Sequence, residues 1–201
     1  CPHSEVLGEG ADQSVTGEAI DVAGNQRSVT VSDVSVDKTS PMITFNRLPL
    51  ANAAGWNNED VTVSYTCSDA LSGTASCTGP AVFSAEAENQ QSIGEAVDVA
   101  GNTSSVAVSG INIDKTSPAI SVSRAPLANA QGWNNTDVLA SYACDDGLSG
   151  VGFCQANELF SAELADQFSR GIVIDLAGNV SETSIGGISI DRTAPVITVG
   201  R

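Results

Sequence analysis

The sequence is poor in several residue types, and each shortage excludes a class of protein. Aromatic residues make up 4% of the 201 residues, and histidine occurs once, as His3. A lone histidine supports no pairing of a nucleophile with a histidine base, and it argues against a zinc site. No stretch keeps apolar residues at helical spacing, and no run of about 18 apolar residues occurs. We therefore expect a chain that is not an enzyme and does not insert into a membrane.

Basic residues are also scarce, with 8 lysines and arginines against 24 acidic residues and a formal net charge of −16. Such a surface repels nucleic acid and anionic lipid, so we expect no nucleic-acid partner. The same charge attracts cations. Two interpretations stay open: the acidity keeps a secreted protein soluble, or it serves a specific cation.

What the sequence does contain is repetition at a fixed period. Three copies of the phrase Asp-Lys/Arg-Thr-Ser/Ala-Pro lie 77 residues apart (114 − 37 = 77 and 191 − 114 = 77), at Asp37, Asp114 and Asp191. The phrase Asp-Val/Leu-Ala-Gly-Asn keeps this spacing, at Asp21, Asp98 and Asp175. We predict four segments: the C-terminal half of a truncated repeat at 1–36, whole repeats at 37–113 and 114–190, and the first strand of a following repeat at 191–201.

Within one repeat the pattern is that of short strands between turns. Val, Ile, Thr and Ser are frequent, and strand-like runs occur at 41–46, 60–66, 81–88, 92–99 and 105–113. Ala-Gly-Asn joins the last two runs, where Gly and Asn supply the positive φ that a tight hairpin needs. Short antiparallel strands in under about 80 residues favour an all-β fold of tandem immunoglobulin-like β-sandwiches arranged end to end. A barrel is the alternative.

Three phrases together carry a family resemblance. "DVAGN" followed by an alternating strand, then "IDKTSP", and "GWNNEDVTVSYTCSDALSG" resemble bacterial immunoglobulin-like repeats of the group 3 type, which occur in tandem in large extracellular and surface proteins. The resemblance covers nearly the whole chain. It implies an immunoglobulin-like sandwich and an extracellular, secreted or cell-surface location, and it implies no catalysis.

The cysteines recur with the period. Cys67 and Cys77 bracket a loop, and Cys144 and Cys154 bracket its copy. Equal spacing in β-rich repeats of secreted type predicts one disulfide within each repeat. Such a bond would stabilise a small domain by about 2–3 kcal/mol in the chain-entropy model. Cys1 lies next to the expected copy of Cys77, and its partner would be missing.

The recurring aspartates are the candidate metal ligands. Calcium takes six to eight oxygen ligands, and carboxylates from the junction phrase and from the Asp-x-Ala-Gly-Asn phrase can supply some. The candidates are Asp37, Asp98, Asp114, Asp175 and Asp191. Loop acids at Asp69, Asp145 and Asp146 can add others. The alternative is that each junction aspartate caps a turn and forms a salt bridge with the next Lys or Arg. No cofactor other than calcium is indicated.

The two tryptophans, Trp56 and Trp133, stand in the repeated phrase "GWNN". An exposed tryptophan on a β-sandwich can stack on a sugar ring, which makes both residues candidate ligand-binding positions. A tryptophan that closes the end of the core or packs against a neighbouring repeat is the more common arrangement, and the sequence favours it.

These observations predict a structural module, an extracellular stalk or spacer from a bacterial surface protein of adhesin-like or filament-forming type. Its partners would be neighbouring repeats of the same or another chain. Two alternatives stay open. One is a glycan- or host-binding adhesin module with a surface ligand, and the other is an accessory region of a secreted hydrolase.

Overall fold

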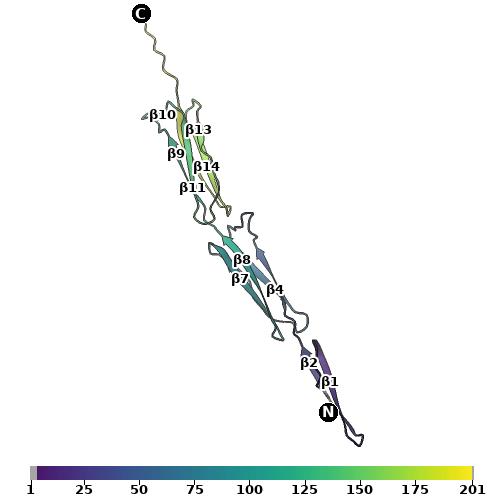
Figure 1. Ribbon diagram of the computed structural model, residues 1–201. Helices are drawn as coiled ribbons and strands as arrows, with labels where there is room; N and C mark the ends of the chain where they lie inside the picture. The colour runs from purple at the N-terminus through teal and green to yellow at the C-terminus, as the bar shows by residue number, and fades with distance from the viewer. Residues whose placement is uncertain (1–3, 201) are drawn as a thin grey trace. The chain divides into compact units, whose positions relative to one another are not determined.

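A computed structural model describes residues 4–200, so Cys1 and His3 lie outside the described part of the chain. The described residues contain strands and no helix, and therefore no helix long and apolar enough to cross a membrane. Figure 1 labels most of the strands. Their bounds are β1 (Gly10–Ile20), β2 (Gln26–Val36), β3 (Met42–Leu48), β4 (Val61–Ser68), β5 (Thr74–Cys77), β6 (Ala81–Phe83), β7 (Ala87–Asp98), β8 (Thr103–Ile113), β9 (Ala119–Ala125), β10 (Trp133–Asn134), β11 (Val138–Asp145), β12 (Val151–Cys154), β13 (Glu158–Phe160), β14 (Gln167–Asp175) and β15 (Val180–Ile190).

The strand limits follow the period of the sequence. β3 and β9 begin 77 residues apart (119 − 42 = 77), and the same offset relates β4 to β11, β5 to β12, β6 to β13 and β8 to β15. β2 precedes β8 by this offset (103 − 26 = 77). The repeated sequence therefore produces repeated secondary structure, as expected when the same apolar alternation and the same turns recur.

The chain divides into two compact units. Unit 1 holds the residues up to Leu48 together with Val61–Phe83 and Gln90–Gly110, and unit 2 holds Pro49–Asp60, Ser84–Asn89 and everything from Ile111. The limits of the predicted repeats, 37–113 and 114–190, stay a prediction. So does their end-to-end arrangement.

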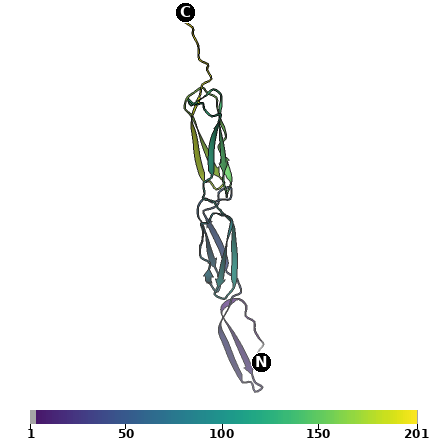
Figure 2. The same cartoon turned by 90° about the vertical axis from the view of Figure 1, so that its left-hand side faces the viewer.

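Unit 2 contains a β-sandwich (Figure 2). One sheet has the strand order β13-β11-β9, and the other has the order β10-β15-β14-β12. The core lies between them, with Val138, Ala140 and Phe160 from the first sheet against Ile188 and Ile190 from the second. Alternate residues of β11 are buried, as expected for strands with one face on a core.

The preceding strands repeat this topology in two sheets, β3-β4-β6 and β5-β7-β8. Taken in chain order as strands A, B, C, E, F and G, the sheets read A-B-E and C-F-G, which is the arrangement of an immunoglobulin-like sandwich. The sheets are separate rather than closed into a barrel. The prediction of an all-β, immunoglobulin-like fold is therefore confirmed.

Each disulfide joins the two sheets of a sandwich. Cys67 in β4 is bonded to Cys77 in β5, and Cys144 in β11 is bonded to Cys154 in β12, with Cα atoms 5.8 and 6.0 Å apart. These are the pairs that the equal spacing predicts. Because β5 and β12 are short edge strands, the covalent bond anchors strands that few backbone hydrogen bonds hold.

A tyrosine and a glycine form a second link between the sheets. In unit 1 the Tyr65 hydroxyl of β4 donates to Ser92 Oγ at 2.6 Å, and the tyrosine ring lies against Gly94 of β7. In unit 2 Tyr142 is hydrogen-bonded to Ser169 and lies against Gly171. A Cβ atom on either glycine would fall 2.2–2.3 Å from the ring, so glycine makes room for the tyrosine.

The strands β1 and β2 form a two-stranded antiparallel sheet of their own. Their apolar side chains are exposed, with Ile20, Val29 and Val31 at 62%, 63% and 58%. The assignment of 1–36 to half a repeat stays a prediction. Residues 191–200 form no strand in the structure, because no neighbouring strand among the described residues pairs with them.

Candidate functional site at the junctions

The junction aspartates cap the chain that follows them. Asp37 Oδ1 accepts a hydrogen bond from the backbone N–H of Thr39 at 3.0 Å, and the equivalent bonds at Asp114 and Asp191 measure 3.1 and 2.9 Å. This is an Asx-type turn, in which a short acidic side chain satisfies a backbone donor two residues on. All three junction aspartates therefore cap a turn, as the alternative to calcium binding expects.

A glutamate accepts hydrogen bonds from the two residues that follow each of the first two junction aspartates. Thr39 Oγ1 and the backbone N–H of Lys38 both donate to Glu9 Oε1, at 3.0 and 2.7 Å. Glu86 accepts the equivalent bonds from Lys115 and Thr116. Glu163 accepts from Thr193 at 2.9 Å. The three glutamates recur at the 77-residue spacing, and sequence reasoning missed them although the period could have revealed them.

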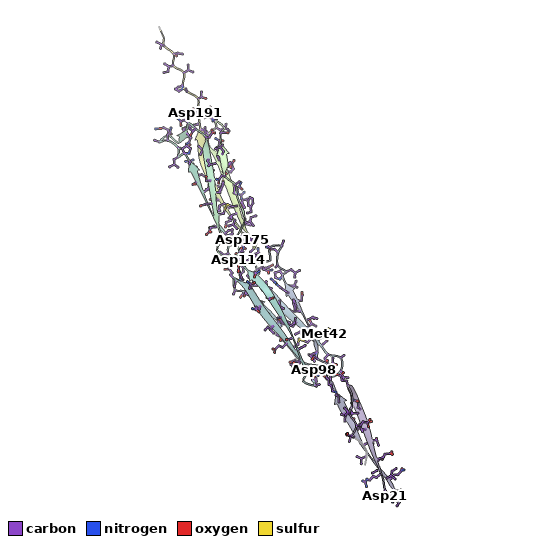
Figure 3. All side chains as sticks on the ribbon, in the orientation of Figure 1. Asp21, Met42, Asp98, Asp114, Asp175 and Asp191 are labelled. Carbon is purple, nitrogen blue, oxygen red and sulfur yellow. A yellow bond between two sulfur atoms is a disulfide. The ribbon has the colours of Figure 1, made fainter. Side chains whose placement is uncertain are left out.

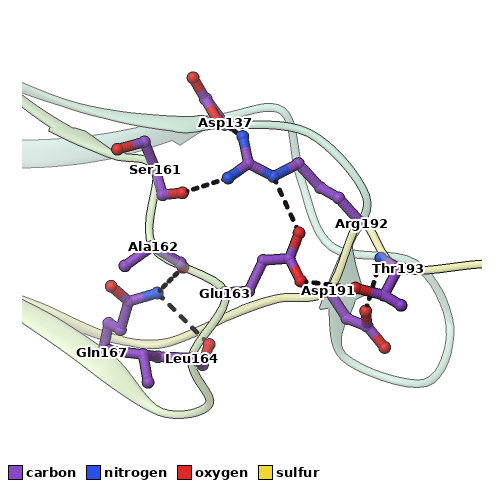
Figure 4. A network of polar contacts seen from close by, with 9 residues as sticks. All are labelled: Asp137, Ser161, Ala162, Glu163, Leu164, Gln167, Asp191, Arg192 and Thr193. Atoms are coloured by element: carbon purple, nitrogen blue, oxygen red, sulfur yellow. Dashed lines mark hydrogen bonds and ion pairs between the residues drawn. The ribbon is translucent and has the colours of Figure 1, made fainter.

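The basic residue of the phrase does not pair with the aspartate before it, contrary to the salt bridge expected in the capping alternative. Lys115 Nζ lies 2.8 Å from Asp60 Oδ1. Arg192 Nη1 lies 2.7 Å from Asp137 Oδ1, and its Nε lies 3.4 Å from Glu163 Oε1 (Figure 4). The reason is geometric: the junction carboxylate already accepts backbone N–H bonds, and the long basic side chain reaches the acids of the neighbouring loops. These pairs are partly exposed, so each contributes little.

The Asp-x-Ala-Gly-Asn turn contributes the other half of the site. In unit 2 Asp175 Oδ1 accepts from the backbone N–H groups of Gly178 and Asn179 at 2.6 and 2.8 Å. Gly178 has φ +98°, as Gly24 (+89°) and Gly101 (+94°) do, so glycine alone supplies the positive φ predicted for this turn. The turn asparagine then faces the junction phrase.

That asparagine ties the turn to the junction. Asn179 Nδ2 donates to the backbone carbonyls of Asp114 and Thr116 at 2.9 and 3.3 Å, and to Asp175 Oδ2 at 2.7 Å. In unit 1 Asn102 makes the equivalent bonds to Asp37 O and Thr39 O at 3.2 and 3.3 Å. One amide side chain thus fixes where the phrase lies against the turn.

The Cys-bracketed loop approaches the same point and brings a third carboxylate. Ser149 N donates to Asp114 Oδ2 at 2.9 Å, and Asp146 of the same loop accepts from Gly150 N at 2.6 Å. The carboxylates of Asp114, Asp146 and Asp175 offer oxygens that all lie within 4.8 Å of one another. Figure 3 labels Asp114 and Asp175, which lie side by side.

An equivalent group in unit 1 consists of Asp37, Asp69 and Asp98. Four of the five predicted metal ligands therefore meet in pairs, each pair joined by one loop acid. Asp191 belongs to neither group among the described residues, and Asp145 stays outside the group that contains its neighbour Asp146. We call these sets the unit 1 and unit 2 carboxylate groups.

Hydrogen bonding favours the charged form of Asp37. The Ser72 side chain is the largest cause, followed by the backbone N–H of Thr39, and together they hold the pKa of Asp37 below its usual value. Asn25 has the same effect on the pKa of Asp21. Carboxylate oxygens are the ligands that calcium prefers. The two carboxylate groups therefore suit a hard cation, although each of their six aspartates already accepts a hydrogen bond from a backbone N–H.

The tryptophans differ in exposure. Trp56 is 7% exposed, which favours the packing role over a ligand-binding role for that residue, whereas Trp133 is 41% exposed. Both stand in a loop of the same local structure. Asn52 Oδ1 accepts from Trp56 N at 3.1 Å, and Asn129 Oδ1 accepts from Trp133 N at 3.0 Å.

Comparison with known proteins gives little beyond the fold. No protein-family model and no curated protein matches the chain. Among solved structures it is similar to the fibronectin(III)-like modules of CbhA from Clostridium thermocellum, at 13% identity and a TM-score of 0.36, over 79% of this chain and 100% of that one. It is also similar to a Ca²⁺-stabilized adhesin of an ice-binding Antarctic bacterium, at 15% identity and a TM-score of 0.36, over 92% of this chain and 58% of that one. Likeness at this level carries no argument about function.

Proposed function

We propose that this chain is a structural spacer, a series of immunoglobulin-like domains of the bacterial group 3 type within an extracellular or cell-surface protein, with no catalytic activity of its own. Its partners are neighbouring repeats. The observation that carries the proposal is the construction of the junction. The recurring residues of the chain converge there, and the contacts that they make hold one segment of backbone in place.

The unit 2 junction supports the proposal in physical terms. Asp114 is fully buried, and its two oxygens accept from Thr116 N and from Ser149 N. Its carbonyl accepts from Asn179, and its own N–H donates to Asn57 O at 3.0 Å. A link in which backbone and side chain are both satisfied has few alternative conformations, because leaving a buried polar group without a partner is costly. Fixed links suit a spacer that must keep its length.

Small-angle X-ray scattering of residues 1–201 tests this function. A spacer should give a radius of gyration well above the roughly 17 Å of a compact globule of this length. The double variant Asp114→Ala with Asn179→Ala should loosen the junction and give a broader distribution of distances. Asp191→Ala is the matched control, because it removes the same capping bond from a junction whose aspartate is exposed. A compact globule, or a double variant with an unchanged scattering curve, would contradict the proposal.

A second part of the proposal concerns calcium at the two carboxylate groups. The supporting observation is that each group brings one oxygen from each of three carboxylates within 4.8 Å of the other two. The aspartates would supply ligand oxygens, and bound calcium would offset the repulsion among their charges.

Thermal unfolding at increasing calcium concentration tests this part. Binding to the native state should raise the melting temperature by mass action, and a chelator should reverse the rise. The variant Asp146→Asn should weaken the response of unit 2, while Asp145→Asn should leave it unchanged as the adjacent control. A melting curve that does not move between zero and millimolar calcium leaves only the capping role for these aspartates.

A further inference from the structure

A hollow surface lies at the end of the second predicted repeat. Asn129, Trp133, Asn134 and Asp191 line it together with Pro126 and Leu127. We call it the Trp133 face. The residues belong to unit 2, and the tryptophan and the aspartate are exposed to solvent. An exposed tryptophan is uncommon enough to need a reason in a chain with two tryptophans.

Unit 2 contains the same surface a second time, one period earlier. Asn52, Trp56, Asn57 and Asp114 occupy the equivalent positions, and here the surface is covered. Asn52 Nδ2 donates to the backbone carbonyls of Leu176 and Ala177 at 2.9 and 3.2 Å. These carbonyls belong to the Asp-Leu-Ala-Gly-Asn turn, so this turn is the element that covers the earlier copy of the surface.

The covered copy of the surface is buried, and the Trp133 face is exposed. Trp56 is 7% exposed and Asp114 is 0% exposed, whereas Trp133 is 41% exposed and Asp191 is fully in the exposed class. On the covering side, Ala177 is 4% exposed. The same turn position is exposed at Ala23 and at Ala100, where no copy of the tryptophan loop faces it among the described residues of unit 1.

The Trp133 loop is already in the conformation of its covered copy. Asn129 N donates to Trp133 O at 2.9 Å, and Asn52 N donates to Trp56 O at 2.8 Å. In both loops the asparagine Oδ1 is occupied by amides of its own loop. The Nδ2 group of Asn129 is then the donor left for a partner, and within the described residues it donates to nothing. A preorganised loop binds without the cost of ordering it.

The covered copy also specifies how large the partner must be. The turn accepts from Asn52, and the Cys-bracketed loop donates from Ser149 N to Asp114. The β1–β2 hairpin has such a turn, at Asp21–Asn25, but the described residues give it no Cys-bracketed loop. The partner therefore needs both elements, which a whole repeat provides.

We propose that the Trp133 face binds a further whole repeat of this sequence type, joined in the same chain after Asp191, through the backbone carbonyls of its Asp-x-Ala-Gly-Asn turn and the amides of its Asp-x-Leu-Ser-Gly loop. This inference rests on the proposed spacer function. Its test measures the solvent accessibility of one tryptophan, whereas the test of the spacer function measures the dimensions of the chain by scattering. Either proposal can therefore fail while the other holds.

The experiment lengthens the chain by one repeat. Residues 115–190 are added after Asp191 in place of 192–201, and the added copy carries the equivalent of Trp133→Phe, so that Trp56 and Trp133 stay the only tryptophans. Acrylamide quenching of fluorescence then compares the original and the lengthened chain. The accessible component assigned to Trp133 should fall about sixfold, the ratio of 41% to 7% exposure, toward that of Trp56.

Asn129→Asp in the lengthened chain is the sharpest control, because the carboxylate keeps the Oδ1 acceptor for the loop and replaces the Nδ2 donor with a charged oxygen, which repels the turn carbonyls. Quenching of Trp133 should then recover. If the added repeat forms its disulfide and unfolds cooperatively while Trp133 stays as accessible as before, the proposal is wrong.

The unmodified chain length offers a second test that does not depend on an added repeat. Asn52→Asp should make Trp56 quenchable in residues 1–201 for the same reason. Unchanged quenching of Trp56 would show that the turn contact does not cover the tryptophan, and it would overturn the proposal as well.

Discussion

The junctions at Asp37 and Asp114 use the same residues and reach different degrees of burial. In both, a serine of the Cys-bracketed loop donates its backbone N–H to the aspartate, from Ser72 at 3.0 Å and from Ser149 at 2.9 Å. Yet Asp37 is half-buried and Asp114 is fully buried. Unit 2 includes the tryptophan loop at 49–60, and the described part of unit 1 has no copy of it. The residues of the junction phrase thus form the same hydrogen bonds at both positions, and the tryptophan loop shields the aspartate from solvent only at Asp114.

The largest effect should come from removing the two aspartates in turn. Asp114→Ala leaves the buried N–H of Ser149 without an acceptor and should lower the free energy of unfolding by about 3 kcal/mol. At Asp37 water can replace the carboxylate, so Asp37→Ala should lower the free energy of unfolding by much less than Asp114→Ala does. Amide hydrogen exchange at Ser149 and Ser72 measures the free energy of local opening at each junction. Equal losses would show that burial does not distinguish the junctions.

A change in the sandwich interior should affect both regions alike. Gly171→Ala and Gly94→Ala each place a Cβ atom against a tyrosine ring, at 2.2 and 2.3 Å. Overpacking of this kind should destabilise each sandwich by about 1–3 kcal/mol, measured by urea unfolding. Gly147→Ala and Gly79→Ala are the controls, because a Cβ atom there meets nothing within 4 Å. Clearly unequal losses at Gly171 and Gly94 would mean that the two interiors are not equivalent.

The smallest effect is electrostatic. Because hydrogen bonds lower the pKa of Asp37 in the folded state, its charged form stabilises unit 1 above the unfolded pKa of about 3.9. That contribution is lost as the pH falls through the lower folded pKa. An NMR titration of the Asp37 carboxyl should show a midpoint below about 3.9, and Ser72→Ala should raise it. A midpoint that Ser72→Ala does not move would rule out the serine as its cause.

Strands with apolar alternation could be predicted from the sequence, and strands without it could not. Val61 and Val63 lie on one face of β4 and are fully buried, as their spacing indicates. The run at 105–113 corresponds to β8 in the same way. β5 was missed, because Thr74–Cys77 has no buried residue and no alternation. Its position depends on the backbone of β7 and on the disulfide, and neither can be seen in four residues of sequence.

The candidate site shows a similar limit. The period identified Asp37, Asp98, Asp114 and Asp175, and the structure brings them together in pairs. The second repeat alone does not say which of the adjacent Asp145 and Asp146 turns toward the junction, although the period does, because Asp146 is the copy of Asp69 and Asp145 is the copy of Ser68. That choice depends on where β11 ends, since Asp145 is the last residue of the strand and Asp146 begins the loop. A difference of one residue in a strand boundary therefore decides the third member of the group.

The inter-sheet disulfide has a consequence for a chain under tension. When a sandwich is pulled apart from its two ends, the force passes through the Cys144–Cys154 bond and bypasses the segment between the cysteines. That segment spans a sequence separation of 10, so about 35 Å of extended backbone is never released. An oxidised repeat that unfolds under load therefore lengthens less than a reduced one. In the proposed spacer, the oxidation state of the cysteines would therefore set how much each repeat lengthens before the next repeat unfolds.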